Sequence, residues 1–416
     1  MSAPDALVYV DLEGTPRLAG RLWVHTRGSS QSASFEYDKT WIEAGHRFAL
    51  EPALQVGVGP YHTTGTRALF SAIGDSAPDR WGRTLLARRE RREAKRQERA
   101  LRTLLEIDYL LGLSDFTRQG ALRFKRDEPG PFLAVGGDLV PPFLDLGTLL
   151  AAAERVTLDE ETDEDLLLLL APGSSLLGSR PKASVRGRND ELLIAKFNRP
   201  DDDWDVGRWE GVAMRLADMA GLHVAQWGIE EVGSSTVLLM RRFDRDGARR
   251  IPFLSASSML EAMDGEPRSY MELADAIRMH SASATEDLYE LWRRVVFIVL
   301  ISNVDDHLRN HGFLYSGSQG WRLSPAYDLN PVPVDVRPRV LSTAIVEGED
   351  RTASIELAFE AAPHFGLALG EAEAIAKQIA AAVVRWRDVA RELGASASTC
   401  DRMSSAFEHE DLASLS

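Results

Sequence analysis

Short runs of residues with strand character occupy the first part of the chain. The runs cover residues 6–12, 21–26 and 34–37, and Gly and Ser residues separate them. They predict a β-rich beginning. Residues 79–106 then have helical character, and their middle, RREAKRQER, is highly charged. This charge favours a solvated helix face, and the alternative is a contact for a nucleic acid or an acidic partner.

Helical periodicity is stronger in the second half of the chain. Apolar residues recur at helical spacing from Trp209 to Met219, and Gly221 is a natural helix stop. Helical character covers residues 208–220, 286–302 and 371–393, and strand character covers 191–197 and 236–240.

An acidic run, DEETDED at residues 159–165, directly precedes five leucines. Carboxylates are favourable at the positively polarised N-terminus of a helix. The run therefore predicts a helix entry, with the leucines at 166–170 buried.

Composition narrows the class of protein. The chain has 416 residues, enough for two or three packed units. Its net charge of −15 repels a phosphate backbone and so argues against unassisted DNA binding. Its single cysteine, Cys400, excludes an internal disulfide and a cysteine zinc site. We expect a cytoplasmic protein, because the beginning lacks a signal-peptide pattern and no apolar stretch is long enough to span a bilayer.

Polar residues crowd together after the apolar segment that ends at Ser302. Asp305 and Asn310 lie five residues apart, ahead of a predicted strand at 312–315. A phosphotransferase needs a carboxylate to orient the attacking hydroxyl and an amide oxygen to hold Mg²⁺. The catalytic loop of protein kinases has the same Asp-to-Asn interval. The spacing therefore favours phosphoryl transfer over a polar solvent loop.

Three further charged residues fit this chemistry. Asp328 follows a predicted strand at 321–323 and would hold the metal that bridges the phosphates, although a Tyr-Asp pair in such a turn is often only a turn-former. Lys196, in a strand-like run, would pair with phosphate, and Glu210 on the next helix would orient it. A solvent-facing strand lysine is the alternative.

The loop at 173–182 is rich in Ser and Gly and ends at Lys182. Its backbone N–H groups could cradle a phosphate. The loop matches neither GxGxxG nor the Walker pattern, so a flexible linker is the alternative.

Six motifs in order resemble those of the HipA-family toxin kinases: GSSLLGSRPKASV, IAKF, RWEGVAMRLADMAGL, LLMRRFDR, NVDDHLRN and SPAYDLNP. The resemblance is strong over residues 168–333. It is weaker at APDRWGR and DYLLGLSDFTRQGALRF in the N-terminal region. It implies an α+β, two-lobed protein-kinase-like fold with a β-rich N-terminal region and an all-helical C-terminal lobe. The expected divisions are 1–125, 126–245 and 246–416.

The resemblance also implies a role for each matching residue. Asp305 would be the catalytic base, and Asn310 and Asp328 the Mg²⁺ ligands. The expected ATP-binding residues are Leu177, Gly178, Ser179, Arg180, Pro181, Lys182, Lys196, Arg241, Arg242, Phe243, His307, Asn310, Tyr327 and Asp328.

Ser175 matches the loop serine that such kinases autophosphorylate, and Ser174 is the alternative. Phosphate there would act as an off-switch, because it adds negative charge beside a site for a polyanion. Arg180, Arg241 and the Leu176–Leu177 pair depart from the family pattern, which affects loop packing and the adenine contacts.

The implied function is an ATP- and Mg²⁺-dependent serine/threonine protein kinase, the toxin of a toxin–antitoxin pair. The implied partners are a helix-turn-helix antitoxin, which brings the chain to DNA, and a protein substrate such as an aminoacyl-tRNA synthetase. One alternative is a catalytically silent corepressor with a kinase fold, and a weaker one is a small-molecule kinase. The presence of Asp305, Asn310, Asp328 and Lys196 favours the active enzyme.

Overall fold

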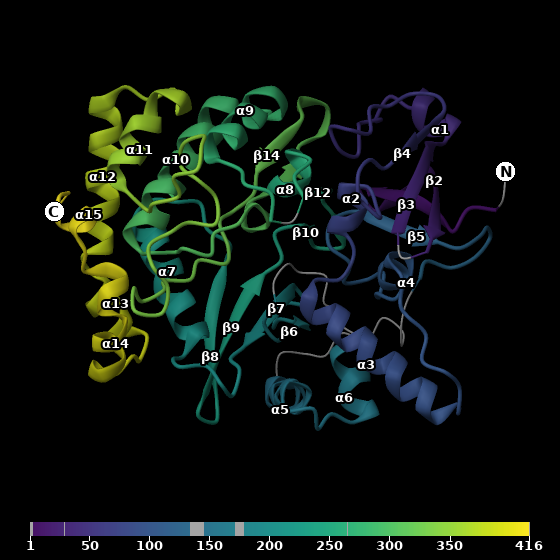
Figure 1. The fold of residues 1–416 in the computed structure, drawn as a ribbon, viewed down its shortest axis with the longest axis horizontal. Coiled ribbons are helices and arrows are strands. Elements are labelled where there is room, and N and C mark those ends of the chain that lie inside the picture. The colour runs from purple at the N-terminus through teal and green to yellow at the C-terminus, as the bar shows by residue number, and fades with distance from the viewer. Residues whose placement is uncertain (1–2, 29, 134–144, 171–178, 264, 416) are drawn as a thin grey trace. The chain divides into compact units, whose positions relative to one another are not determined.

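A computed structural model describes residues 3–28, 30–133, 145–170, 179–263 and 265–415 (Figure 1). The chain forms two compact units. Unit 1 comprises Met1–Asp201, Val232–Ser234 and Arg241–Leu254, and unit 2 comprises Asp202–Glu231, Ser235–Met240 and Ser255–Ser416.

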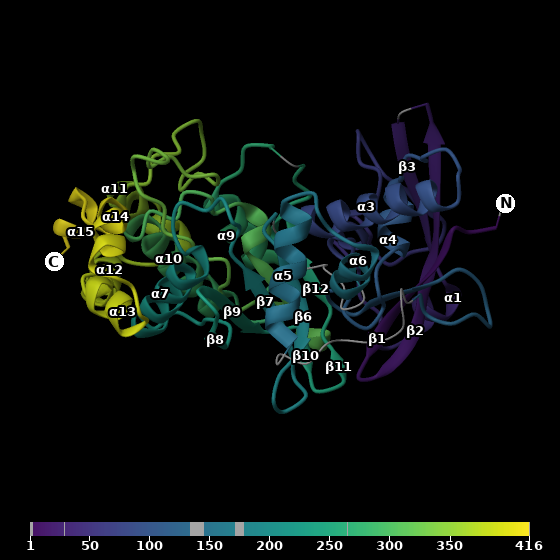
Figure 2. The same cartoon turned by 90° about the horizontal axis from the view of Figure 1, so that it is seen from below.

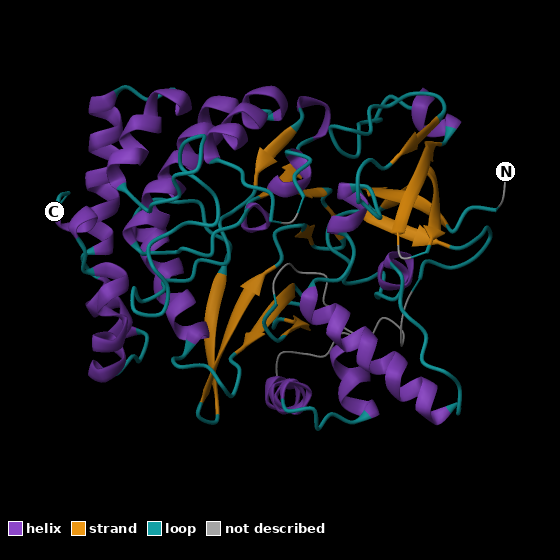
Figure 3. Cartoon of the chain, in the orientation of Figure 1, coloured by secondary structure: helices purple, strands orange, loops and turns teal. Residues whose placement is uncertain are grey.

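Unit 1 begins with a five-stranded sheet in the order β4-β3-β2-β1-β5, drawn in orange in Figure 3. Its strands are β1 (Ala6–Leu12), β2 (Thr15–Arg27), β3 (Ser30–Tyr37), β4 (Pro60–His62) and β5 (Leu122–Lys125), and all its pairings are antiparallel. β1 lies between β2 and β5, and its residues from Ala6 to Val10 are buried. The predicted β-rich beginning is therefore confirmed.

Helices and a hairpin complete unit 1. The helices are α1 (Lys39–Glu43), α2 (Ser71–Asp75), α3 (Arg80–Arg96), α4 (Glu106–Leu111), α5 (Leu146–Thr157) and α6 (Asp163–Leu170). β6 (Lys182–Arg186) and β7 (Leu192–Phe197) form an antiparallel hairpin in which Lys182 pairs opposite Lys196. Short strands follow at β10 (Arg245–Asp246), β11 (Arg249–Arg250) and β12 (Phe253–Ser255).

The helix expected over residues 79–106 is shorter than predicted. α3 ends at Arg96, and Glu98 has a positive φ of 49°. The buried Glu90 carboxylate accepts hydrogen bonds from Arg99 at 2.6 Å and Arg102 at 3.3 Å. These bonds hold the following segment against the helix, so the chain turns back before α4 begins.

Unit 2 is mainly helical. Its helices are α7 (Val206–Met219), α8 (Ala256–Met259), α9 (Tyr270–His280), α10 (Ala284–Leu300), α11 (Ile355–Ala361), α12 (Leu369–Val383), α13 (Trp386–Glu392), α14 (Ala397–Phe407) and α15 (Glu410–Ala413). Its strands are β8 (Trp227–Val232), β9 (Ser235–Arg241), β13 (Gly312–Tyr315) and β14 (Trp321–Leu323). α10 is the central helix, because it contacts α9, α11, α12 and α15. Figure 2 shows α11 to α15 gathered in one group.

The single helix expected over residues 371–393 is also divided. α12 ends at Val383, and α13 begins at Trp386. The Trp386 ring stacks on Phe407 of α14, with ring centroids 4.7 Å apart and planes 8° apart. This buried contact favours a change of direction that no Gly or Pro marks in the sequence.

No described helix combines the length and the apolar character that crossing a membrane requires.

Candidate active site

The loop after α10 carries the predicted catalytic residues. α10 ends at Leu300, and Ser302 then takes a positive φ of 50°, which turns the chain sharply. The loop continues through a short 3-10 helix, Leu308–Asn310, into β13. The Val332 N–H binds the Ser302 carbonyl at 3.2 Å, and the Ser342 N–H binds the Val304 carbonyl at 3.0 Å. Backbone contacts to later segments thus hold the loop from both sides.

Asp305 presents its carboxylate to solvent. Its side chain is 60% exposed, and its Oδ1 lies 3.0 Å from Nη1 of Arg337. A hydroxyl group of an incoming molecule can therefore reach this carboxylate. Arg337 was not among the residues that the sequence indicated, because no motif in RPR marks it.

The neighbouring Asp306 is buried, and its carboxylate and backbone carbonyl both accept hydrogen bonds. Its Oδ2 lies 2.6 Å from Nε2 of His311 and also accepts a hydrogen bond from the Tyr270 hydroxyl. Its backbone carbonyl accepts a bond from Thr343 at 2.8 Å. Burial, and then the Asp306 carboxylate, raise the pKa of Tyr270 well above its ordinary value, so the phenol remains a donor. Asp306 therefore fixes the loop rather than meeting a substrate.

Asn310, in the same loop, has a buried side-chain oxygen. Its Nδ2 donates to the Asp305 carbonyl at 3.4 Å, and its Oδ1 has no hydrogen-bond partner among the described residues. His307, half-buried, likewise has an unpartnered Nδ1 within the described part of the chain. A buried acceptor without a donor is costly in a folded protein unless a ligand or water satisfies it.

Hydrogen bonds join the turn around Asp328 to the Asp305–Asn310 loop. The Tyr327 hydroxyl donates to the Arg309 carbonyl at 2.8 Å, and the Asn330 N–H donates to Oδ1 of Asn303 at 3.3 Å. Asn330 also donates to Oδ1 of Asp328 at 3.3 Å. Asp328 has a φ of 60°, a strained backbone conformation for a residue with a side chain. The structure thus brings together the two loops that the sequence paired, and it adds Asn330 as a supporting residue.

These residues fit a magnesium ion. Mg²⁺ prefers oxygen ligands, and it is held in kinases by one or two protein groups together with phosphate oxygens. The orphaned Oδ1 of Asn310 and the half-buried carboxylate of Asp328 supply such a set. No described group of three or more His, Cys, Asp or Glu side chains could hold a metal, so a site made of protein ligands alone is not found in the described ranges.

The predicted phosphate loop is described only in part. The described part begins at Ser179 and includes Lys182. Outside it lie Ser175, Leu177 and Gly178. Nζ of Lys182 lies 2.7 Å from Oδ2 of Asp79, and both side chains are at most 3% exposed. The Lys182 ammonium therefore faces a protein carboxylate, and its expected contact with a phosphate stays a prediction. Asp79 belongs to the APDRWGR motif, whose role the sequence had not indicated.

Arg242 likewise faces a protein carboxylate. Its side chain is 2% exposed, and its Nε donates to Oδ1 of Asp244 at 2.6 Å. Burial alone would raise the pKa of Asp244, but the Arg242 and Arg245 guanidinium groups hold it well below its ordinary value. Nη1 of Arg242 donates to the Thr117 carbonyl at 2.9 Å. This side chain therefore has a structural role in unit 1, and the expected place of Arg242 in the ATP site stays a prediction.

Three other residues that were expected to bind ATP are at least partly exposed to solvent. Lys196 is half-buried on β7, Arg241 is exposed at the end of β9, and Phe243 is half-buried after it. Glu210 lies near the start of α7 and is 3% exposed. A carboxylate buried this deeply needs a partner. Its expected orienting role stays a prediction.

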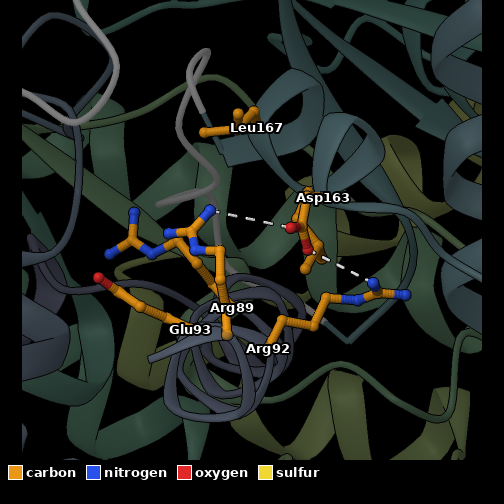
Figure 4. A pocket seen from close by; sticks show the side chains of 7 residues that line it. Arg89, Arg92, Glu93, Asp163 and Leu167 are labelled. Carbon is orange, nitrogen blue, oxygen red and sulfur yellow. Dashed lines mark hydrogen bonds and ion pairs between the residues drawn. The ribbon is translucent and has the colours of Figure 1, made fainter. Parts of the chain in front are cut away.

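A separate groove lies between α3 and α6 in unit 1 (Figure 4). It has a volume of about 270 Å³ and is lined by Arg89, Arg92, Glu93, Arg96, Asp163, Leu166 and Leu167. Asp163 pairs with Arg92 at 3.4 Å and with Arg96 at 4.0 Å. The groove lies at the charged helix and contains none of the predicted catalytic residues.

Comparisons with known proteins agree with the motifs. Residues 174–387 match the family model of the HipA-like C-terminal domain, and residues 10–107 match that of the HipA N-terminal domain. A Haemophilus influenzae protein named "Putative kinase" is 23% identical over 212 residues, 45% of this chain and 62% of that protein. A Sinorhizobium fredii protein named "Putative kinase Y4dM" is 31% identical over 144 residues, 34% of this chain and 32% of that protein. The chain thus spans less than two thirds of the length of these relatives.

A solved structure shares the fold. A chain of the Shewanella oneidensis MR-1 toxin–antitoxin complex of HipA, HipB and operator DNA is 15% identical to this chain, with a TM-score of 0.69. The match covers 99% of this chain and 96% of that one. The predicted α+β, kinase-like fold is therefore confirmed.

Proposed function

Because the chain belongs to the HipA family, we propose that it is a protein kinase that transfers the γ-phosphoryl group of ATP to a serine or threonine hydroxyl. One observation carries the proposal. The exposed carboxylate of Asp305, the orphaned oxygen of Asn310 and the carboxylate of Asp328 belong to loops that are hydrogen-bonded to each other. Phosphoryl transfer needs these three groups for positioning and charge stabilisation.

Each group has one task. Asp305 orients the acceptor hydroxyl and takes its proton. Asn310 and Asp328 hold Mg²⁺, which when bound neutralises charge on the phosphate oxygens. Asp306 keeps the loop in place through His311. Asn330 positions the Asp328 carboxylate.

The remaining assignments follow from motif position. Lys196 pairs with the ATP phosphates, and Glu210 orients it. The backbone of residues 177–182 cradles phosphate, with Lys182 anchoring the loop through Asp79. Arg241 and Phe243 contact the adenine. Autophosphorylation at Ser175 stays a prediction.

We infer the biological role from the family. The solved HipA chain is in complex with HipB and operator DNA. By analogy, this chain is a toxin that acts with a helix-turn-helix antitoxin and reaches DNA through it. The proposed acceptor is a translation protein such as an aminoacyl-tRNA synthetase.

The test is labelled-phosphate transfer from Mg-ATP to proteins of a cell lysate. Asp305→Asn and Asp328→Asn should each lower transfer by about 10²-fold or more. The first removes the group that orients and deprotonates the acceptor hydroxyl, and the second removes a carboxylate that would hold Mg²⁺. Asp388→Asn is the matched control, since Asp388 is exposed on α13 and should leave transfer unchanged. Chelation of Mg²⁺ should abolish transfer by every variant.

Near-normal transfer by folded Asp305→Asn or Asp328→Asn protein would refute the assignment. A wild-type chain that binds an antitoxin but consumes no ATP would instead support the silent corepressor.

A further inference from the structure

A short segment beside Asp305 exposes an unusual number of apolar side chains. Val334, Val336 and Val340 are 41%, 40% and 46% exposed, and they fall within seven residues of one another. We call residues 333–340 the valine segment. Single exposed apolar residues are ordinary on a protein surface, whereas a cluster marks an interaction site.

Contacts within unit 2 hold the valine segment in place. The Val334 N–H donates to Oγ of Ser405 at 3.1 Å, and both oxygens of Asp335 lie 2.9 Å from Nη1 of Arg402. Arg339 donates to the Val299 carbonyl at 2.9 Å and pairs with Asp411. A surface fixed at both ends loses little conformational entropy when it binds a partner.

Arg337 extends from this segment to the proposed catalytic base. A turn places it, because the Arg337 N–H donates to the Pro333 carbonyl at 3.1 Å. Its Nη1 lies 3.0 Å from Oδ1 of Asp305, and the two side chains are 56% and 60% exposed. The guanidinium thus lies where an acceptor hydroxyl would approach.

An ion pair this exposed is weak, because water screens it. An acceptor can therefore displace Arg337 from Asp305 if it offers the guanidinium another anion. Asp335, the carboxylate of the valine segment, already pairs with Arg402, and Asp411 on α15 pairs with Arg339. Neither is free to take Arg337, so we infer that a carboxylate of the acceptor replaces Asp305.

We propose that the valine segment is the docking surface for the acceptor protein, and that Arg337 selects an acceptor segment with a carboxylate near the reacting hydroxyl. The acceptor carboxylate binds Arg337 and frees Asp305, while apolar side chains of the acceptor cover the valines. The inference rests on the proposed kinase function and specifies its substrate as an acidic segment of a protein with apolar neighbours.

Positional-scanning libraries of Ser/Thr peptides test this selection with the full chain, Mg²⁺ and labelled ATP. Wild-type protein should prefer Asp or Glu over Lys or Arg by about tenfold at one position near the hydroxyl. Arg337→Glu should reverse that preference. Arg351→Glu is the matched control, because Arg351 is exposed outside the valine segment and should keep the wild-type preference.

A second variant tests the apolar part. Val334→Ser combined with Val336→Ser should raise KM for peptides with apolar neighbours and leave kcat unchanged, because these valines contribute binding area only. Circular dichroism and the rate of Mg-ATP hydrolysis establish that each variant is folded and active.

Four outcomes separate the possibilities. An acidic preference that survives Arg337→Glu overturns the selection by Arg337. A lower rate of Mg-ATP hydrolysis in Arg337→Glu, with the labelling of every peptide lowered equally, assigns Arg337 to the phosphates and also overturns the selection. Wild-type protein that hydrolyses Mg-ATP but labels no peptide overturns the docking surface alone. Wild-type protein that does not consume Mg-ATP overturns the proposed function and this inference together.

Discussion

Two adjacent aspartates have opposite environments. Asp305 is exposed and pairs with Arg337, whereas Asp306 is 1% exposed and binds His311 and Tyr270. An exposed ion pair stabilises a fold little, whereas a buried, hydrogen-bonded carboxylate contributes much more. Within one loop, Asp305 therefore serves catalysis and Asp306 serves stability.

Asp306→Asn should therefore lower the free energy of unfolding by about 2–4 kcal/mol, since it leaves buried partners of the carboxylate imperfectly paired. Asp305→Asn should change it by less than about 0.5 kcal/mol. Urea unfolding followed by tryptophan fluorescence measures both. Equal losses for the two variants would contradict the structural role of Asp306.

The sequence could identify some of the site residues and not others. The five-residue interval singled out Asp305 and Asn310 because the motif is local. Lys182 and Arg242 were assigned to ATP by their positions in motifs that resemble those of the HipA family. Their actual partners, Asp79 and Asp244 with the Thr117 carbonyl, include groups more than a hundred residues away. No local pattern reveals such a pairing.

At the level of elements, the basic residues of α3 form ion pairs with the acidic run at 159–165. Arg88 on α3 lies 2.6 Å from Oε2 of Glu161 and 2.5 Å from Oδ1 of Asp159, and Arg92 pairs with Asp163. These contacts favour the structural interpretation of the charged helix over a nucleic-acid contact. The acidic run begins α6 as predicted, but at Asp163, and Leu167 is 50% exposed rather than buried.

The Arg88–Glu161 pair should therefore stabilise the contact between α3 and α6. Glu161 and Arg88 side chains are 9% and 16% exposed, so water screens their attraction only partly. A double-mutant cycle with Arg88→Ala and Glu161→Ala should give a coupling energy of about 1–2 kcal/mol in chemical unfolding.

The exposed Lys39–Glu43 pair is the control, with side chains 85% and 65% exposed, and its coupling should stay below about 0.5 kcal/mol. A coupling energy at Arg88–Glu161 no larger than this would show that the charged residues of α3 face solvent and do not stabilise its contact with α6.

Element types were easier to predict than their ends. The strands expected at 312–315 and 321–323 have those bounds in the structure. The helices expected over 79–106 and 371–393 are divided instead. Their ends depend on tertiary contacts, the bonds of Glu90 to Arg99 and the stacking of Trp386 on Phe407. Periodicity reports which face is apolar, and it does not report such contacts.

At the scale of the whole molecule, charge limits the partners. The net charge is −15, and several cations of the strongly basic helix α3 are paired with carboxylates. A polyanion therefore meets long-range repulsion, so DNA affinity must come mainly from a basic partner.

The isolated chain should therefore bind a labelled operator duplex with a Kd no tighter than roughly 10⁻⁵ M at about 0.15 M salt, and more tightly only as salt falls. Adding the helix-turn-helix antitoxin should bring the Kd to roughly 10⁻⁸ M, because the partner supplies phosphate contacts and reads the bases. Fluorescence anisotropy measures both.

Arg91→Glu, at an exposed position of α3, should leave the affinity of the complex unchanged if this helix does not touch DNA. Tight, sequence-specific binding by the chain alone would mean that a local basic face outweighs the net charge. The antitoxin would then not be the subunit that reads the DNA.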